Sequence, residues 1–143
     1  MIRRAAATVA AAGVLAACGT VRTPGQALRS WSVASGFGSA AVTLHGDAVS
    51  VARVLRGPDP TAKRLHLVCA VLLVDSEAAN ASLPTPVDQV TRLLSRAYDS
   101  LGAAAHLCYG AAGAGGRQAA LAELQRATAQ LAEGRAALVA LSG

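Results

Sequence analysis

Aromatic residues are scarce in this chain: they make up 3% of its 143 residues, and tryptophan and phenylalanine occur once each. Hydrophobic residues of all kinds make up 53%, and alanine dominates them. Alanine, leucine and valine fill little space, so a core built from them requires closely approaching helices. The formal net charge is +5, but the basic residues are scattered. The sequence therefore lacks the basic stripe interleaved with aromatics that indicates nucleic-acid binding.

Catalytic motifs are also missing. The serines have no Gly-x-Ser-x-Gly setting and no convincing histidine partner. The glycines between Gly110 and Gly116 lack the Gly-Lys-Ser/Thr ending of a phosphate-binding loop. The carboxylates are spread along the chain, and Asp47 is interpreted as one half of a surface ion pair with a basic helix end. We therefore expect neither enzymatic activity nor a cofactor.

No apolar run approaches the length of about 20 residues that a membrane-spanning helix needs. The N-terminus instead carries Arg3 and Arg4, followed by the uncharged and mostly apolar segment 5–14. Basic residues, a short apolar segment and small residues in this order are typical of a cleavable signal peptide. We therefore expect residues 1–17 to be removed and exclude them from the fold.

This segment ends in Leu15-Ala16-Ala17-Cys18, followed by Gly19. The pattern resembles the lipobox of bacterial lipoproteins, in which the cysteine thiol receives a diacylglycerol, the chain is cut just before it, and the new N-terminus can be acylated. The resemblance covers residues 1–18. It implies lipidation of Cys18 and a membrane anchor at the extracytoplasmic face. The alternative is a conventional signal peptide cut near Ala17, with Cys18 unmodified.

Lipidation of Cys18 leaves two further cysteines, Cys69 and Cys108. In an exported protein, two cysteines on the apolar faces of neighbouring helices are expected to form a disulfide. In a straight hairpin turning near Pro84, the two lie about 15 and about 24 residues from the turn, a mismatch of over 10 Å at 1.5 Å per residue. Bridged Cα atoms lie within about 7 Å of each other. We therefore expect either a chain that bends back between Gly102 and Cys108 or an asymmetric hairpin.

The same residues support a competing interpretation. His66 lies three residues before Cys69, and His106 lies two before Cys108. Two histidines and two cysteines can form a tetrahedral zinc site, which would make the chain a metal-binding or enzymatic protein. The His-x-Cys spacing does not place both side chains on one helix face, and an oxidising compartment favours a disulfide. We therefore expect no metal, and expect His45, His66 and His106 to be surface or partly buried helix residues.

Apolar residues recur at helical spacing in four segments. These segments are residues 39–56, about 60–80, 86–101 with a possible extension to 109, and about 117–141. Proline- and glycine-rich stretches separate them. The second contains the nearly continuous apolar run 65–74, which we expect to be the most buried part of the domain. The pattern predicts an all-α fold: a four-helix bundle over residues 39–143 with up-down-up-down topology.

Residues 18–38 are rich in glycine and serine and predict a flexible tether between lipid and bundle. The tether contains the single tryptophan, Trp31. An indole can contact the membrane interface, or it can dock with Phe37 on the bundle as a cap. We favour the cap, because a large aromatic side chain usually buries its area where it can.

The last predicted helix repeats leucine every seven residues, at Leu124, Leu131 and Leu138. This face can pack inside the bundle or join two copies of the chain, and the two uses compete.

A second resemblance covers most of the mature chain. The residues that carry it are Trp31, Ser35-Gly36, Leu44, Asp47, Cys69, Leu83-Pro84-x-Pro86, Tyr98 and Cys108. They resemble small secreted or lipid-anchored helical proteins of actinobacteria, a family that implies a disulfide-stapled bundle and no assigned activity. We therefore expect a non-enzymatic envelope module that binds a protein, an envelope polymer or a small apolar ligand. An exposed apolar groove between helices would favour this function.

Overall fold

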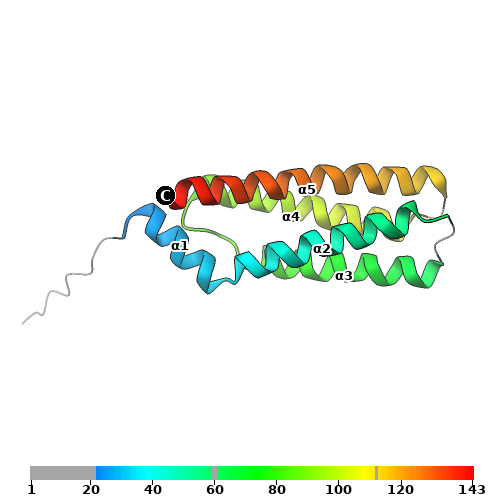
Figure 1. Cartoon of the computed structure of the whole chain (residues 1–143), viewed down its shortest axis with the longest axis horizontal. Helices are drawn as coiled ribbons and strands as arrows, with labels where there is room; N and C mark the ends of the chain where they lie inside the picture. Colours follow the sequence, from blue (N-terminus) through cyan, green and yellow to red (C-terminus); the bar gives the residue numbers. More distant parts are fainter. Residues whose placement is uncertain (1–21, 59–60, 112) are drawn as a thin grey trace, which may run out of the picture.

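The structure, a computed structural model, describes residues 22–58, 61–111 and 113–143. These residues form five helices and no strand: α1 (Pro24–Ala34), α2 (Phe37–Arg56), α3 (Ala62–Asn80), α4 (Asp88–Tyr109) and α5 (Ala114–Ser142). The long helices α2 to α5 lie side by side and alternate in direction, and α1 lies obliquely at the end where the chain terminates (Figure 1). The all-α prediction is confirmed, with one helix more than predicted. The predicted signal peptide and Cys18 lie outside the described residues.

The additional helix, α1, corrects the prediction of a flexible tether up to residue 38. Thr23 begins it with a capping box: its hydroxyl accepts from the Gln26 backbone N–H at 3.2 Å, and the Gln26 side chain accepts from the Thr23 N–H at 3.0 Å. Pro24 occupies the first helical position, where its fixed φ suits a helix. Leu28 is fully buried against the bundle. The glycine and serine content that suggested a linker belongs partly to the turn after α1, where Gly36 has a φ of 65°.

Trp31 and Phe37 cap the bundle, as predicted. The Trp31 indole N–H donates to the Ser82 carbonyl oxygen at 3.2 Å, and the two aromatic ring centroids lie 5.7 Å apart. At the other side of α1, the Arg29 guanidinium donates to two carbonyl oxygens: that of Ser142, the last residue of α5, and that of Gly143. These contacts attach α1 to the loop after α3 and to the end of α5.

The hairpin formed by α3 and α4 is asymmetric. Helix α4 runs unbroken through Gly102, so the chain does not bend back there. Helix α3 ends 11 residues after Cys69, whereas α4 begins 20 residues before Cys108. At 1.5 Å per residue, α4 therefore extends about 13 Å beyond the end of α3. The connection 81–87 runs along this extra length from the end of α3 to the start of α4. Helix α1 lies beyond the end of α3 (Figure 1).

The core consists of leucines packed among small residues. The largest fully buried side chains include Leu28, Leu44, Leu72, Leu94 and Leu101. Helices α4 and α5 approach closely at Gly134, where a Cβ atom would lie 2.7 Å from Leu94 Cδ2. This close approach agrees with the expectation drawn from the alanine-rich composition.

Helix α3 is not the most buried segment, which corrects the expectation for the apolar run 65–74. Leu65, Cys69 and Leu72 are buried, but Leu67, Val71 and Val74 are 65%, 42% and 60% exposed. The run is apolar on both sides of the helix, while the neighbouring helices cover only one of them. None of the described helices is long and apolar enough to cross a membrane.

The heptad leucines of α5 pack inside the protein. Leu124, Leu131 and Leu138 are 3%, 3% and 7% exposed. The alternative in which this face joins two copies of the chain is therefore wrong, because its side chains already contribute to the core.

Candidate functional site

A disulfide joins Cys69 of α3 to Cys108 of α4, as the sequence predicts. Their Cα atoms lie 5.8 Å apart, and both side chains are fully buried. His66 and His106 are exposed, as expected, and the His66 ring lies 5.4 Å from the ring of Tyr109. In residues 22–58, 61–111 and 113–143, no group of three or more histidine, cysteine or acidic side chains could hold a metal ion. Two of the four residues proposed as zinc ligands, Cys69 and Cys108, have their sulfurs bonded to each other.

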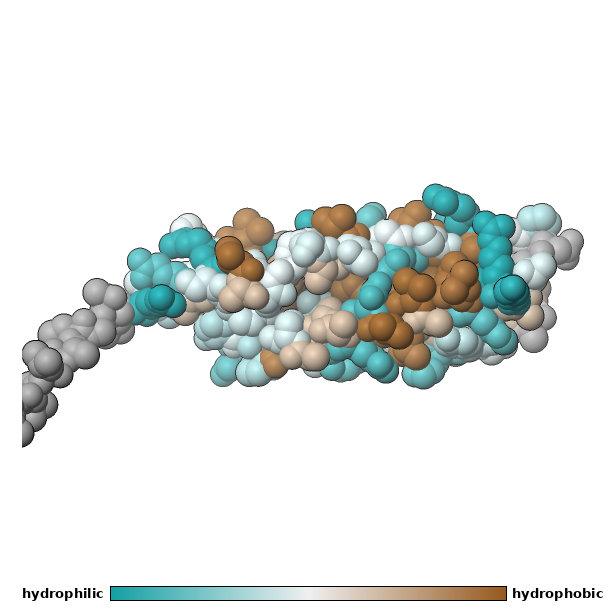
Figure 2. Space-filling view, turned by 90° about the horizontal axis from the view of Figure 1, so that it is seen from below, coloured by the Kyte–Doolittle hydropathy of each residue, from teal (hydrophilic) through white to brown (hydrophobic). Residues whose placement is uncertain are grey.

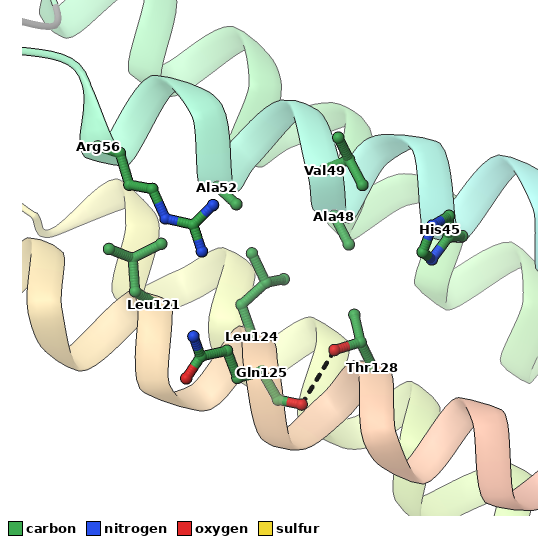
Figure 3. A pocket seen from close by; sticks show the side chains of 9 residues that line it. All are labelled: His45, Ala48, Val49, Ala52, Arg56, Leu121, Leu124, Gln125 and Thr128. Carbon is green, nitrogen blue, oxygen red and sulfur yellow. Dashed lines mark hydrogen bonds between the residues drawn. The ribbon is translucent and has the colours of Figure 1, made fainter.

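The structure contains an apolar groove of about 200 Å³ between α2 and α5 (Figure 3). Its lining residues are His45, Ala48, Val49, Ala52, Arg56, Leu121, Leu124, Gln125 and Thr128. Ala48 and Ala52 lie one turn apart on α2 and face Leu121 and Leu124 of α5 (Figure 3). Alanine side chains are too short to fill the space between the two helices, so the groove stays open along this seam.

Polar side chains lie around this apolar wall. Arg56, the last residue of α2, extends across one end toward Leu121, and His45 lies at the other end (Figure 3). Thr128 directs its hydroxyl to its own helix, where it donates to the Gln125 carbonyl oxygen at 2.9 Å. The groove therefore combines an apolar wall with a cationic side chain at one end.

Sequence reasoning did not identify this groove. Apolar periodicity predicts a helix over residues 39–56, but it does not show which residues of α5 lie opposite that helix. The only available signal was alanine at residues 48 and 52, where a leucine would fill the seam.

A pair of carboxyl groups links α2 and α3. The pKa of Asp47 is raised from 3.8 to about 6, first by burial, then by a hydrogen bond to Asp75 and by repulsion from its charge. One carboxyl oxygen of Asp47, Oδ2, is buried without a hydrogen-bond partner. The prediction that Asp47 pairs with a basic residue is therefore wrong, because Asp47 faces a second carboxyl group across the helix seam.

The carboxyl pair lies beside a pocket of about 350 Å³, to which Asp75 contributes. The pocket is also lined by Ser35, Ser39, Thr43 and Ser82. The two carboxyl groups repel each other when both are ionised, which favours a proton on Asp47.

Comparison of the chain with protein-family models, with curated proteins and with solved structures finds no match. The resemblance to small actinobacterial helical proteins is thus not accompanied by a family match. What the structure shows is a small all-helical protein with a Cys69–Cys108 disulfide.

Proposed function

We propose that this chain is a non-enzymatic lipoprotein of the bacterial cell envelope, anchored through Cys18 and displayed at the extracytoplasmic face of the membrane. The pattern Leu15-Ala16-Ala17-Cys18 supports lipidation of that cysteine. The disulfide between Cys69 and Cys108 supports a location outside the reducing cytoplasm, where such bonds persist. The domain then binds its ligand close to the membrane surface.

The observation that carries the binding function is the α2–α5 groove. Its apolar wall favours a ligand that loses water-exposed apolar surface on binding. The Arg56 guanidinium at one end favours a carboxylate or phosphate, to which arginine can donate two parallel hydrogen bonds. A volume of about 200 Å³ is below the 300–1,000 Å³ of most small-molecule sites. The proposed ligand is therefore a small amphiphile with one short apolar chain and an acidic end.

Decanoic acid and decanol test this site, because they share an apolar chain and differ in charge. Binding is measured by isothermal titration calorimetry on the full chain with Cys18→Ser, which cannot be lipidated. Arg56→Gln should weaken binding of decanoic acid about tenfold, the cost of one charge-assisted hydrogen bond, and leave binding of decanol unchanged. The account is contradicted if neither compound binds, or if Arg56→Gln affects both equally.

A groove-filling substitution provides the matched test of location. Ala52→Phe should abolish binding of both compounds, because the new ring occupies the space between α2 and α5. Ala136→Phe is the control, since Ala136 is exposed on α5 and is not part of the groove. Binding that survives Ala52→Phe would place the ligand elsewhere.

Metabolic labelling with a palmitate analogue in a bacterial host tests the anchor. The wild-type chain should incorporate the label, and Cys18→Ser should lose it. The double variant Cys69→Ser/Cys108→Ser should keep the label, because its lipidation site is intact. Label retained by Cys18→Ser, or absent from the wild type, would contradict lipidation at this residue.

A further inference from the structure

The outer face of α3 carries an apolar stripe that the described part of the chain leaves uncovered. Leu67, Val71, Val74 and Ala78 are exposed and follow one another at intervals of four, three and four residues. This is the spacing of the a and d positions of a coiled-coil seam. Figure 2 views the molecule from the side on which α3 lies in Figure 1 and shows apolar side chains at the surface among hydrophilic ones.

A row of residues with charges of opposite sign at its two ends runs along one side of this stripe. Lys63, Ala70 and Glu77 are spaced seven residues apart and therefore lie in one row beside it. Lys63 and Glu77 are both exposed. The row thus has a positive end, a small residue in its centre and a negative end.

This arrangement is complementary to itself when two copies of α3 pack antiparallel. A twofold axis near Ala70 and Val71 places Lys63 of each copy opposite Glu77 of the other. It also places Leu67 of each copy opposite Val74 of the other. The small side chain of Ala70 lies at the axis, where it permits close approach of the two helices.

We infer that the outer face of α3 is the interface of an antiparallel homodimer of this chain. An anionic lipid surface would attract Lys63 and repel Glu77, whereas a second copy pairs the two. The interface uses neither the α2–α5 groove nor Cys18, so it stands independently of the proposed function. A single helix pair buries less than the 1,200–2,000 Å² of stable complexes, so the dimer dissociates on dilution.

Exchange of the Lys63 and Glu77 charges tests the interface, because an unfolded variant would not recover dimerisation when the two variants are mixed. Sedimentation equilibrium of the full chain with Cys18→Ser should show a monomer–dimer equilibrium. Lys63→Glu or Glu77→Lys alone should weaken dimerisation about tenfold, because two exposed ion pairs become repulsive. An equimolar mixture of the two variants should form a heterodimer as tight as the wild-type dimer, and the double variant should recover self-association.

The apolar stripe is tested with a matched pair of variants. Leu67→Glu should leave the chain monomeric. Val139→Glu, at a residue 71% exposed on α5, should leave the equilibrium unchanged. Circular dichroism establishes that both variants are folded.

Three results would overturn the inference. The first is a monomeric wild type up to a concentration on the order of 1 mM, a Kd too weak to be specific. The second is a dimer that persists in Leu67→Glu or a charge-variant mixture that stays monomeric. The third is wild-type binding to phosphatidylglycerol vesicles that Leu67→Glu abolishes while the chain in solution is monomeric, which would assign the face to a lipid surface.

Discussion

Removal of the Cys69–Cys108 disulfide should strongly lower the free energy of unfolding. The bond joins residues 39 apart in the sequence. In the chain-entropy treatment, a cross-link closing a loop of this size stabilises the folded state by about 4 kcal/mol at 25 °C. Domains of this kind are stable by about 5–15 kcal/mol in total. The double variant Cys69→Ala/Cys108→Ala should therefore lose a large share of the stability of the fold.

Guanidinium unfolding followed by helical circular dichroism measures this loss by linear extrapolation. Wild-type protein in reducing agent keeps both buried sulfurs and loses only the cross-link. Comparing it with the double variant therefore separates the effect of the cross-link on chain entropy from the effect of losing the packed sulfur atoms. Cys18→Ser serves as the control, because Cys18 precedes the described helices, and it should leave the free energy of unfolding unchanged. A loss below about 1 kcal/mol in both the variant and the reduced protein would refute the reasoning.

Four further substitutions test the helix packing, the carboxyl pair and the attachment of α1. Gly134→Ala should destabilise the protein by about 1–3 kcal/mol, because its Cβ would collide with buried Leu94. Gly46→Ala is the control: it lies in open space on α2 and should stabilise the protein by up to about 1 kcal/mol. If both substitutions changed the free energy of chemical unfolding equally, the close approach of α4 and α5 would be contradicted. The folded state raises the pKa of Asp47 from 3.8 to about 6, so it binds this proton more tightly than the unfolded chain. Stability should therefore fall as the pH rises between these values, by about 1 kcal/mol after allowance for solvent screening. In denaturant titrations, Asp47→Asn should lack this part of the pH dependence, and an unchanged slope would contradict the assignment. Trp31→Ala should remove the hydrogen-exchange protection of α1 and leave that of α4 intact, whereas protection retained in α1 would show that Trp31 does not hold it.

Apolar periodicity and proline placement were sufficient to predict the four long helices. Val90, Leu94 and Leu101 lie on one face of α4, and that face is buried. The cysteine pairing also followed from the sequence, since only two cysteines remain once Cys18 is assigned to lipid. In contrast, α1 was missed because glycine and serine were interpreted as a linker, although the Thr23–Gln26 capping box was present.

Features that depend on contacts between helices could not be derived from periodicity. Helix α3 is apolar on both sides, so its sequence did not show that Leu67 and Val74 would remain exposed. The pairing of Asp47 with Asp75 joins residues on different helices, and no local pattern brings them together. The α2–α5 groove has the same origin, because it arises from alanines on one helix facing leucines on another.

Intact-mass spectrometry of the chain purified from bacterial membranes tests the central proposal most directly. The account predicts a polypeptide that begins at Cys18, carries a diacylglycerol on that thiol, and lacks the two hydrogens removed by the Cys69–Cys108 bond. A chain that begins elsewhere without lipid, or one in which Cys69 and Cys108 are free thiols, would contradict it.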